Sequence, residues 1–259
     1  MPTLRLDDFD LYYETAGSGT PLLFIHGLGS SARDWAPQTA AFAKDHFVIA
    51  VDLRGHGRSG DPAGPYSIAG FARDITRLLD HLACGPAHVV GVSLGGGIAF
   101  QLALDAPERV RSLVVVNSAP EMILRTAMQK FAIWQRRKLV KWLGLPRFGR
   151  ILSRKLFPDD PAQADAFAGH FATNRERPYT DTLNALIGWS IIDRLGEICM
   201  PTLILAADQD YTPVAFKQDY TARIPGAKLV VIPDSRHALP MERPEAFNRA
   251  LAAFLERHR

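Results

Sequence analysis

The pentapeptide Gly91-Val92-Ser93-Leu94-Gly95 decides how the whole chain is interpreted. The run before it, 87–92, is apolar and typical of a buried strand, and the run after it, 94–104, is rich in small and apolar residues and typical of a helix. A serine between two glycines at a strand-to-helix turn is the context of a nucleophile elbow, because bulky neighbours would clash in so tight a turn. The pattern therefore predicts that Ser93 stands out at the carboxyl end of a strand. A glycine-rich turn with an incidental serine is the alternative.

Strand-like and helix-like stretches alternate on both sides of this turn. Near-continuous apolar runs, which suit parallel strands covered on both faces, occur at 21–26, 47–52, 87–92, 110–116, 202–207 and 228–232. Helical spacing of apolar residues occurs at 68–82, 94–104, 213–223 and 244–257. This order predicts an α/β fold, in which a mostly parallel, twisted sheet with right-handed crossovers has helices on both faces.

The middle of the chain, residues 120–196, breaks this alternation. It is helix-patterned, aromatic and basic, and glycine and proline residues interrupt it. The chain has 259 residues, 47% of them hydrophobic, which is enough to bury one sizeable core. We therefore expect a core formed by residues 1–119 and 197–259, with residues 120–196 inserted as helices over one end of the sheet.

A serine hydroxyl is a poor nucleophile without a base, and the base needs a carboxylate to hold it. Among the eight histidines, His237 is distinguished by its place on the loop after the last predicted strand, at the same sheet end as Ser93. A surface-loop histidine is the alternative. Asp208 and Asp210 both follow the preceding strand, and Asp210 is favoured because it lies further out on the loop. Asp208 would then cap the turn or helix that follows.

An oxyanion hole needs two N–H donors aimed at the developing negative charge. One is predicted at Leu94, directly after the candidate nucleophile, and the other at Leu28, in the glycine-containing loop after the strand 21–26. His26, which opens that loop, is interpreted as a structural residue that bonds the loop backbone rather than as a catalyst.

Five stretches together resemble the α/β-hydrolase superfamily along nearly the whole chain. They are HGLG at 26–29, DLRGHGRS at 52–59, GVSLGG at 91–96, DQDYTP at 208–213 and SRHALPMERPEAFN at 235–248. The resemblance implies Ser93 as nucleophile, Asp210 as acid and His237 as base. It also implies oxyanion donors at Leu28 and Leu94 and a lid formed by residues 120–196.

Two positions depart from the usual pattern of this superfamily. Ala207 stands before the acidic loop and Arg236 before the histidine, where glycine is common, and both changes concern loop geometry rather than a catalytic group. In the stretch 52–59, Arg54, His56 and Arg58 permit a binding-site interpretation. The resemblance favours a structural turn that braces the elbow.

These residues predict a carboxylic ester hydrolase that works through an acyl-enzyme, with an apolar or aromatic ester as its small-molecule substrate. No metal or organic cofactor is needed. Serine at the elbow argues against the dehalogenases and epoxide hydrolases that resemble this chain but use aspartate there. A carbon–carbon bond hydrolase, a lactonase, a cofactor-free perhydrolase and a small-molecule receptor of the same fold remain as alternatives. The expected pocket residues of the insertion are Met122, Phe131, Trp134 and Trp189.

The charge of the chain is concentrated in one segment. The net charge is +3, but residues 125–155 contain ten Lys and Arg residues and no Asp or Glu, so the rest of the chain is acidic on balance. A solvated helix face is the simplest interpretation. Docking of an acidic carrier protein and contact with an anionic membrane surface are the alternatives. Nucleic-acid binding is not expected, because no recognition motif accompanies the charge.

The sequence also allows a prediction of the cellular compartment in which the protein is found. It has only two cysteines, Cys84 and Cys199, which form no CxxC pair and are expected to be reduced thiols. The first residues lack a basic segment followed by an apolar stretch, and no apolar run reaches the roughly 18–20 residues that span a bilayer. These features predict a cytoplasmic protein.

Overall fold

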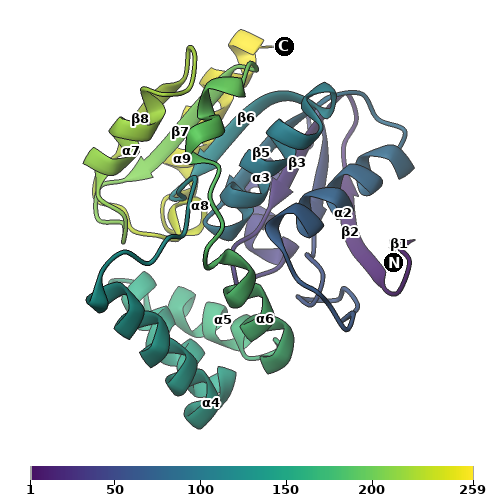
Figure 1. The fold of residues 1–259 in the computed structure, drawn as a ribbon. Coiled ribbons are helices and arrows are strands. Elements are labelled where there is room, and N and C mark those ends of the chain that lie inside the picture. Colours follow the sequence, from purple (N-terminus) through teal and green to yellow (C-terminus); the bar gives the residue numbers. More distant parts are fainter. Residues whose placement is uncertain (1, 259) are drawn as a thin grey trace.

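A computed structural model describes residues 2–258 and has one twisted sheet with helices on both of its faces (Figure 1). Within these residues the sheet has eight strands in the order β1-β2-β4-β3-β5-β6-β7-β8. β1 (Thr3–Arg5) and β2 (Asp10–Ala16) are antiparallel to each other, and β2 is antiparallel to β4 (His46–Val51). The remaining pairs are parallel and add β3 (Thr20–Ile25), β5 (Ala87–Val92), β6 (Val110–Val116), β7 (Thr202–Ala207) and β8 (Lys228–Ile232). The predicted α/β fold with a mostly parallel sheet is therefore confirmed.

The central strands are apolar throughout because both of their faces are covered. On one face, Leu23 of β3 packs in a cluster with α2 (Ile68–His81) and α3 (Leu94–Asp105). On the other face, Leu22 of the same strand packs with α1 (Ala36–Phe42), α9 (Pro244–Leu255) and the turn η1 (Ala32–Trp35). The remaining short elements are α7 (Val214–Thr221), α8 (Leu239–Glu242), η2 (Pro107–Arg109), η3 (Ile192–Glu197) and η4 (Glu256–His258).

Three α-helices lie between β6 and β7 in the chain and sit together at one end of the sheet (Figure 1). They are α4 (Ala127–Leu156), which is kinked at Gly144, α5 (Pro161–Phe171) and α6 (Glu176–Leu186). We call them the helical insertion. Their apolar cluster, built around Phe148, Phe171 and Tyr179, also contacts Leu28, Ala238 and Met241 from loops of the core. The insertion therefore packs on the loops that carry the candidate site residues.

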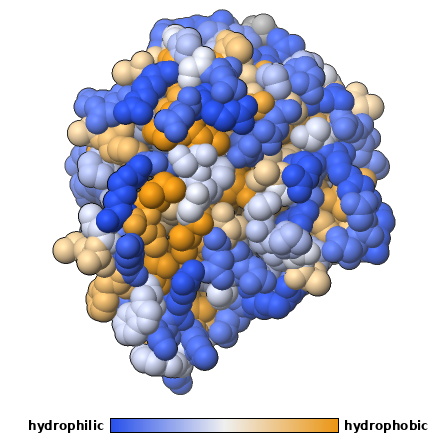
Figure 2. Space-filling view, in the orientation of Figure 1, coloured by the Kyte–Doolittle hydropathy of each residue, from blue (hydrophilic) through white to orange (hydrophobic). Residues whose placement is uncertain are grey.

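The helical insertion meets the rest of the molecule along an apolar strip. Figure 2 shows apolar residues at the surface along this junction, bordered by polar residues. α4 is the longest helix of the insertion, and its sequence mixes apolar and basic residues. Among residues 2–258 no helix combines the length and hydropathy that crossing a membrane requires.

Candidate active site

The turn between β5 and α3 has the strained geometry that its sequence predicts. Ser93 has φ 55° and ψ −117°, a left-handed conformation that costs a non-glycine residue about 1–3 kcal/mol. Its backbone N–H donates to the carbonyl of Val116 at 2.9 Å, and the Ser118 hydroxyl donates to the Ser93 carbonyl at 2.6 Å. A Cβ at Gly91 would clash with the Gly95 carbonyl, and one at Gly95 with the Ile25 carbonyl. Neighbouring backbone thus holds Ser93 at the start of α3.

The predicted base and acid are paired. His237 Nδ1 lies 2.5 Å from Asp210 Oδ1, and the Asp210 side chain is fully buried while that of His237 is 21% exposed. Asp208, the alternative acid, instead accepts the backbone N–H groups of Asp234 and Ser235 at 3.1 Å each. Asp208 therefore joins the acidic loop to the histidine loop, and Asp210 is the aspartate that meets the imidazole.

Asn117 was not anticipated from the sequence, and it ties the same two loops together. It follows β6 directly, and its side-chain amide donates to the carbonyls of Arg236 and His237 at 3.0 and 3.1 Å. Its Oδ1 accepts the N–H of Ala207 at 2.8 Å. One buried side chain thus fixes the end of β7 and the histidine loop, although neither Ala207 nor Arg236 is the glycine that is common at those positions. An asparagine directly after an apolar strand was the signal that could have pointed to it.

Lys217 of α7 is the second unanticipated residue. Its side chain is fully buried, and its ammonium donates to Asp210 Oδ2 at 2.5 Å and to the Thr212 carbonyl at 2.8 Å. The Thr212 hydroxyl donates to the same carboxylate oxygen at 2.9 Å. Burial alone would raise the pKa of Asp210, but the hydrogen bonds and charges of His237 and Lys217 lower that pKa to about 2. The carboxylate therefore stays ionised beside the imidazole.

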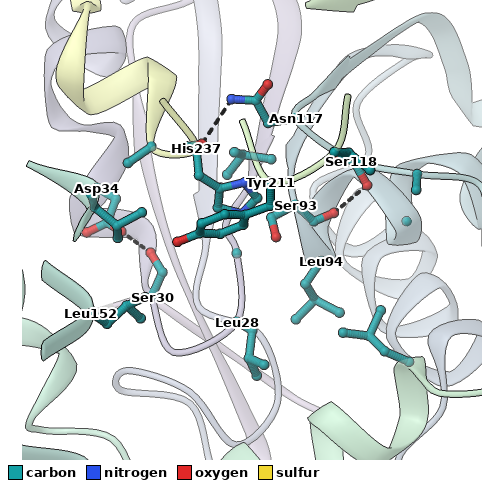
Figure 3. Close-up of a pocket in the computed structure, with 18 of the residues that line it drawn as sticks. Leu28, Ser30, Asp34, Ser93, Leu94, Asn117, Ser118, Leu152, Tyr211 and His237 are labelled. Carbon is teal, nitrogen blue, oxygen red and sulfur yellow. Dashed lines mark hydrogen bonds between the residues drawn. The ribbon is translucent and has the colours of Figure 1, made fainter. Parts of the chain in front are cut away.

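Ser93 and His237 line one cavity of about 320 Å³ between the core loops and the helical insertion (Figure 3). Leu28 and Leu94, the predicted oxyanion donors, line it as well. Leu94 is the first residue of α3, where backbone N–H groups have no partner within the helix. Tyr211 is stacked on the His237 ring with centroids 4.4 Å apart, and this contact was not anticipated.

The pocket residues predicted in the insertion divide into two pairs. Met122 and Trp189 line the cavity, and the Trp189 indole N–H donates to Gln101 at 2.8 Å. Phe131 and Trp134 do not line it; they are 58% and 50% exposed on the outer side of α4. For these two residues the prediction is wrong, because helical spacing reveals a stripe of aromatic residues but not the side on which it lies.

The loops around residues 26 and 52–59 are structural. His26 Nε2 accepts the N–H of Leu53 at 3.0 Å, and its Nδ1 lies 2.7 Å from the Gly27 carbonyl. The Arg58 guanidinium donates to Asp52 at 2.9 Å, and that of Arg54 to Asp74 at 2.6 Å. These contacts support the interpretation of the segment as a turn that braces the elbow.

The described residues contain no group of three or more His, Cys, Asp or Glu side chains placed to hold a metal ion. Cys84 and Cys199 are free thiols, as the spacing predicts.

Known proteins resemble this chain over nearly its whole length. It is 35% identical to "Putative carbamate hydrolase RutD" of Azorhizobium caulinodans, covering 98% of each chain, and 33% identical to "3-oxoadipate enol-lactonase 2" of Acinetobacter baylyi, covering 98% of this chain and 96% of the relative. A thermophilic esterase from Thermogutta terrifontis superposes with a TM-score of 0.88 at 25% identity, with 97% of this chain and 95% of the other covered. The family model described as alpha/beta hydrolase fold matches residues 20–244. The chain is a hydrolase of the α/β-hydrolase fold family.

Proposed function

We propose that the protein hydrolyses carboxylic esters, with Ser93 as nucleophile, His237 as general base and Asp210 as the carboxylate that orients the base. The main support is that Ser93, at its strained turn, and His237 line the same cavity. Because Asp210 accepts the Nδ1–H of His237, the Nε2 lone pair of the ring is left free to take a proton.

The reaction has two halves. His237 Nε2 takes the Ser93 proton as Oγ attacks the ester carbonyl carbon, and the N–H groups of Leu28 and Leu94 donate to the oxyanion. The bond to the leaving alcohol breaks as His237 returns the proton to that oxygen. Water then attacks the acyl carbon, giving a proton to His237, and the bond to Ser93 breaks with return of that proton. The acid is released and the enzyme is restored.

The cavity lining supports an organic acyl group of moderate size. Most of the lining is apolar, with leucines and aromatic residues from both the core and the insertion, including Leu28, Leu152, Leu186 and Trp189. Hydrolysis of a lactone is the second candidate, favoured by the similarity to the relative named as an enol-lactonase. A lactone undergoes the same acyl transfer, except that its leaving alcohol stays attached to the acyl group.

The test is a panel of aryl esters, alkyl esters and lactones with the wild type, Ser93→Ala and Ser118→Ala. We expect Ser93→Ala to lose about 10³-fold or more in kcat. Ser118 lines the same cavity, but its hydroxyl donates to the backbone carbonyl of Ser93 and does not react, so Ser118→Ala should lower kcat far less than Ser93→Ala does. A fluorophosphonate should label Ser93 in the wild type, as read by mass spectrometry. Near-wild-type turnover by Ser93→Ala would exclude the nucleophile assignment.

A further inference from the structure

Arg136 of α4 places a permanent positive charge in the cavity wall. Of the residues that line this cavity in the described chain, it is the only lysine or arginine. It stands opposite the core loops, on the helical insertion. A guanidinium that borders a largely apolar cavity is expected to have a counter-ion, because an unpaired charge loses hydration there.

The protein gives Arg136 a neutral partner instead. Its Nε and Nη2 donate to the Tyr179 hydroxyl at 2.9 and 2.5 Å, and its guanidinium lies over the Phe148 and Tyr179 rings at 5.6 Å from each centroid. Burial raises the pKa of Tyr179, so this phenol stays neutral and cannot balance the charge. Within residues 2–258 no carboxylate forms an ion pair with Arg136, and its Nη1 has no hydrogen-bond partner.

The acidic residues of the same cavity are engaged elsewhere. Glu121 accepts two hydrogen bonds from Arg125, at 2.6 and 2.9 Å. Asp34 is held by the Ser30 hydroxyl. Neither carboxylate is paired with Arg136, whose Nη1 therefore remains available to donate to a ligand.

Arg136 also lies within electrostatic range of Tyr211. Burial raises the pKa of Tyr211, and the charge of Arg136 opposes that rise. The Tyr211 ring is the one stacked on His237. A substrate whose carbonyl is beside Ser93 and His237 can therefore extend an anionic end toward Arg136 within one cavity.

We propose that Arg136 binds a carboxylate carried by the substrate, so that the preferred substrates are half-esters or lactones of dicarboxylic acids. This inference rests on the proposed ester hydrolysis and names its substrate class. The Tyr179 hydroxyl fixes the guanidinium, and Nη1 is the donor left for the carboxylate. Charge-assisted pairs of this kind are short and strong, which makes the anionic end a determinant of specificity.

The test compares two aryl esters of equal chain length, 4-nitrophenyl hexanoate and 4-nitrophenyl hydrogen adipate. Wild type should favour the adipate half-ester in kcat/KM. Arg136→Met should lose about 10- to 100-fold on the half-ester, mainly through KM, with a much smaller change on the hexanoate. Arg136→Lys should keep part of the preference, since it keeps the charge but not the planar donor. The matched control is Arg137→Met, whose guanidinium instead contacts Asn184.

Equal losses on both esters in Arg136→Met, or no preference in the wild type, would overturn the proposal. If wild type hydrolyses neither ester, the proposed reaction fails instead. The subsite is then tested by calorimetric titration of adipate into wild type and Arg136→Met. Binding that disappears in the variant supports the subsite, and the absence of binding to wild type overturns it.

The outer side of α4 carries a second, independent feature. Met128, Phe131, Trp134 and Trp142 are 81%, 58%, 50% and 69% exposed, and their spacing places them along one stripe of the helix. Lys138 lies between the Trp134 and Trp142 rings, with its ammonium 5.8 and 5.4 Å from their centroids. We call these five residues the aromatic stripe.

We infer that the aromatic stripe lies on an anionic lipid surface. Exposed tryptophan and phenylalanine side chains beside lysines, on a segment with ten basic and no acidic residues, match an interfacial helix, whereas a solvated face does not require the aromatic residues. An acidic carrier protein would satisfy the charge but leave the rings unexplained. The charge makes anionic headgroups the complementary surface.

Vesicle co-sedimentation tests the stripe. The full protein should bind vesicles of phosphatidylcholine mixed with phosphatidylglycerol about tenfold more tightly than vesicles of phosphatidylcholine alone. A Trp134→Ala/Trp142→Ala variant and a Lys138→Glu/Lys141→Glu variant should each lose this binding, while Lys228→Glu, an exposed lysine on β8, should not. Absence of binding to the anionic vesicles, or equal binding by all variants, would overturn the inference. So would self-association through the stripe in light scattering.

Discussion

The core loops and the helical insertion differ in how their charged side chains are paired. In the core, Asp210 is contacted by His237, Lys217 and Thr212, and every partner can be named. In the insertion, Arg136 has a neutral partner. Under the proposed function, the core loops are organised before substrate arrives, and the insertion supplies the charge that we propose binds the substrate.

The two regions also differ in how readily they are expected to accept amino-acid substitutions. The elbow is fixed by backbone contacts around Gly91 and Gly95, so few substitutions are tolerated there. The insertion packs mainly through aromatic side chains such as Phe171, which contacts both Gly29 and Gly149. Cores of this kind accept hydrophobic exchanges more readily than tight turns do. Chemistry is therefore expected to reside in the core, and substrate choice in the insertion.

The largest expected effect is that of Asp210→Asn. The amide cannot stabilise the imidazolium and can favour the wrong tautomer of His237, so kcat should fall by about 10³- to 10⁴-fold. Asp208→Asn is the matched control: it removes a carboxylate that accepts only backbone N–H groups, and activity should change far less. Steady-state kinetics of both variants on one aryl ester measure the two losses in kcat. A larger loss in Asp208→Asn would reverse the assignment of the acid.

Lys217→Met should lower the free energy of unfolding strongly. Removing one partner of a buried pair costs about 3–5 kcal/mol in the free energy of unfolding. The pKa of Asp210 is lowered in the folded protein, so its stabilisation is present above the unfolded value of 3.8 and is lost as the pH falls toward about 2. The deficit of Lys217→Met relative to wild type should therefore shrink over that range.

Urea unfolding between pH 2 and pH 6 measures this deficit. Lys228→Met, at an exposed position on β8, is the control and should follow the wild type throughout. A deficit that stays constant with pH would indicate that Lys217 contributes packing rather than its charge beside Asp210.

Much of the fold, and the elements that carry the candidate site residues, could be predicted from the sequence because local patterns determine them. Continuous apolar runs indicate doubly covered strands, and two glycines around Ser93 indicate a turn with no room for Cβ atoms. β2 was not predicted, because its sequence, DLYYETA, mixes polar and apolar residues. Such a mixture is compatible with its position beside the antiparallel edge strand β1.

The partners of the site could not be predicted, because they depend on tertiary contacts. Lys217 lies in a short helix, where a lysine side chain is ordinarily exposed. Its burial is explained only by the loop that carries Asp210, which packs against it in the folded protein. Within α4, Arg136 and Lys138 are both basic and two positions apart. One borders the cavity and the other lies between exposed rings. Because both residues are basic, the sequence alone does not distinguish them. The packing of the insertion on the core determines which of the two borders the cavity.

A smaller effect is expected at Asp34, the acidic residue on the core side of the cavity. Burial raises its pKa to about 6, against the hydrogen bond from Ser30, and the nearby Asp52 adds to the rise. A raised pKa means that the ionised form costs stability above about pH 6, and that this cost vanishes as the pH falls toward the unfolded value of 3.8. Asp34→Asn should therefore stabilise the protein by about 1–2 kcal/mol at pH 8 and much less at pH 4.

Thermal unfolding of wild type and Asp34→Asn at several pH values tests this difference. Asp45→Asn, an exposed carboxylate beside Lys44, should change little at any pH. A stabilisation by Asp34→Asn that is larger at pH 4 than at pH 8 would have the wrong sign for a raised pKa.

The smallest effect is expected for Trp142→Ala in the aromatic stripe. Its side chain is 69% exposed, so the change in the free energy of unfolding should stay within about 0.5 kcal/mol. Phe148, on the same helix but 7% exposed, is the matched comparison, and Phe148→Ala should cost about 3–5 kcal/mol. Urea unfolding of both variants measures the contrast. A loss of about 2 kcal/mol or more in Trp142→Ala, the low end of the range for core truncations, would mean that the ring stabilises the helix itself. The stripe would then need no lipid surface to explain its aromatic residues.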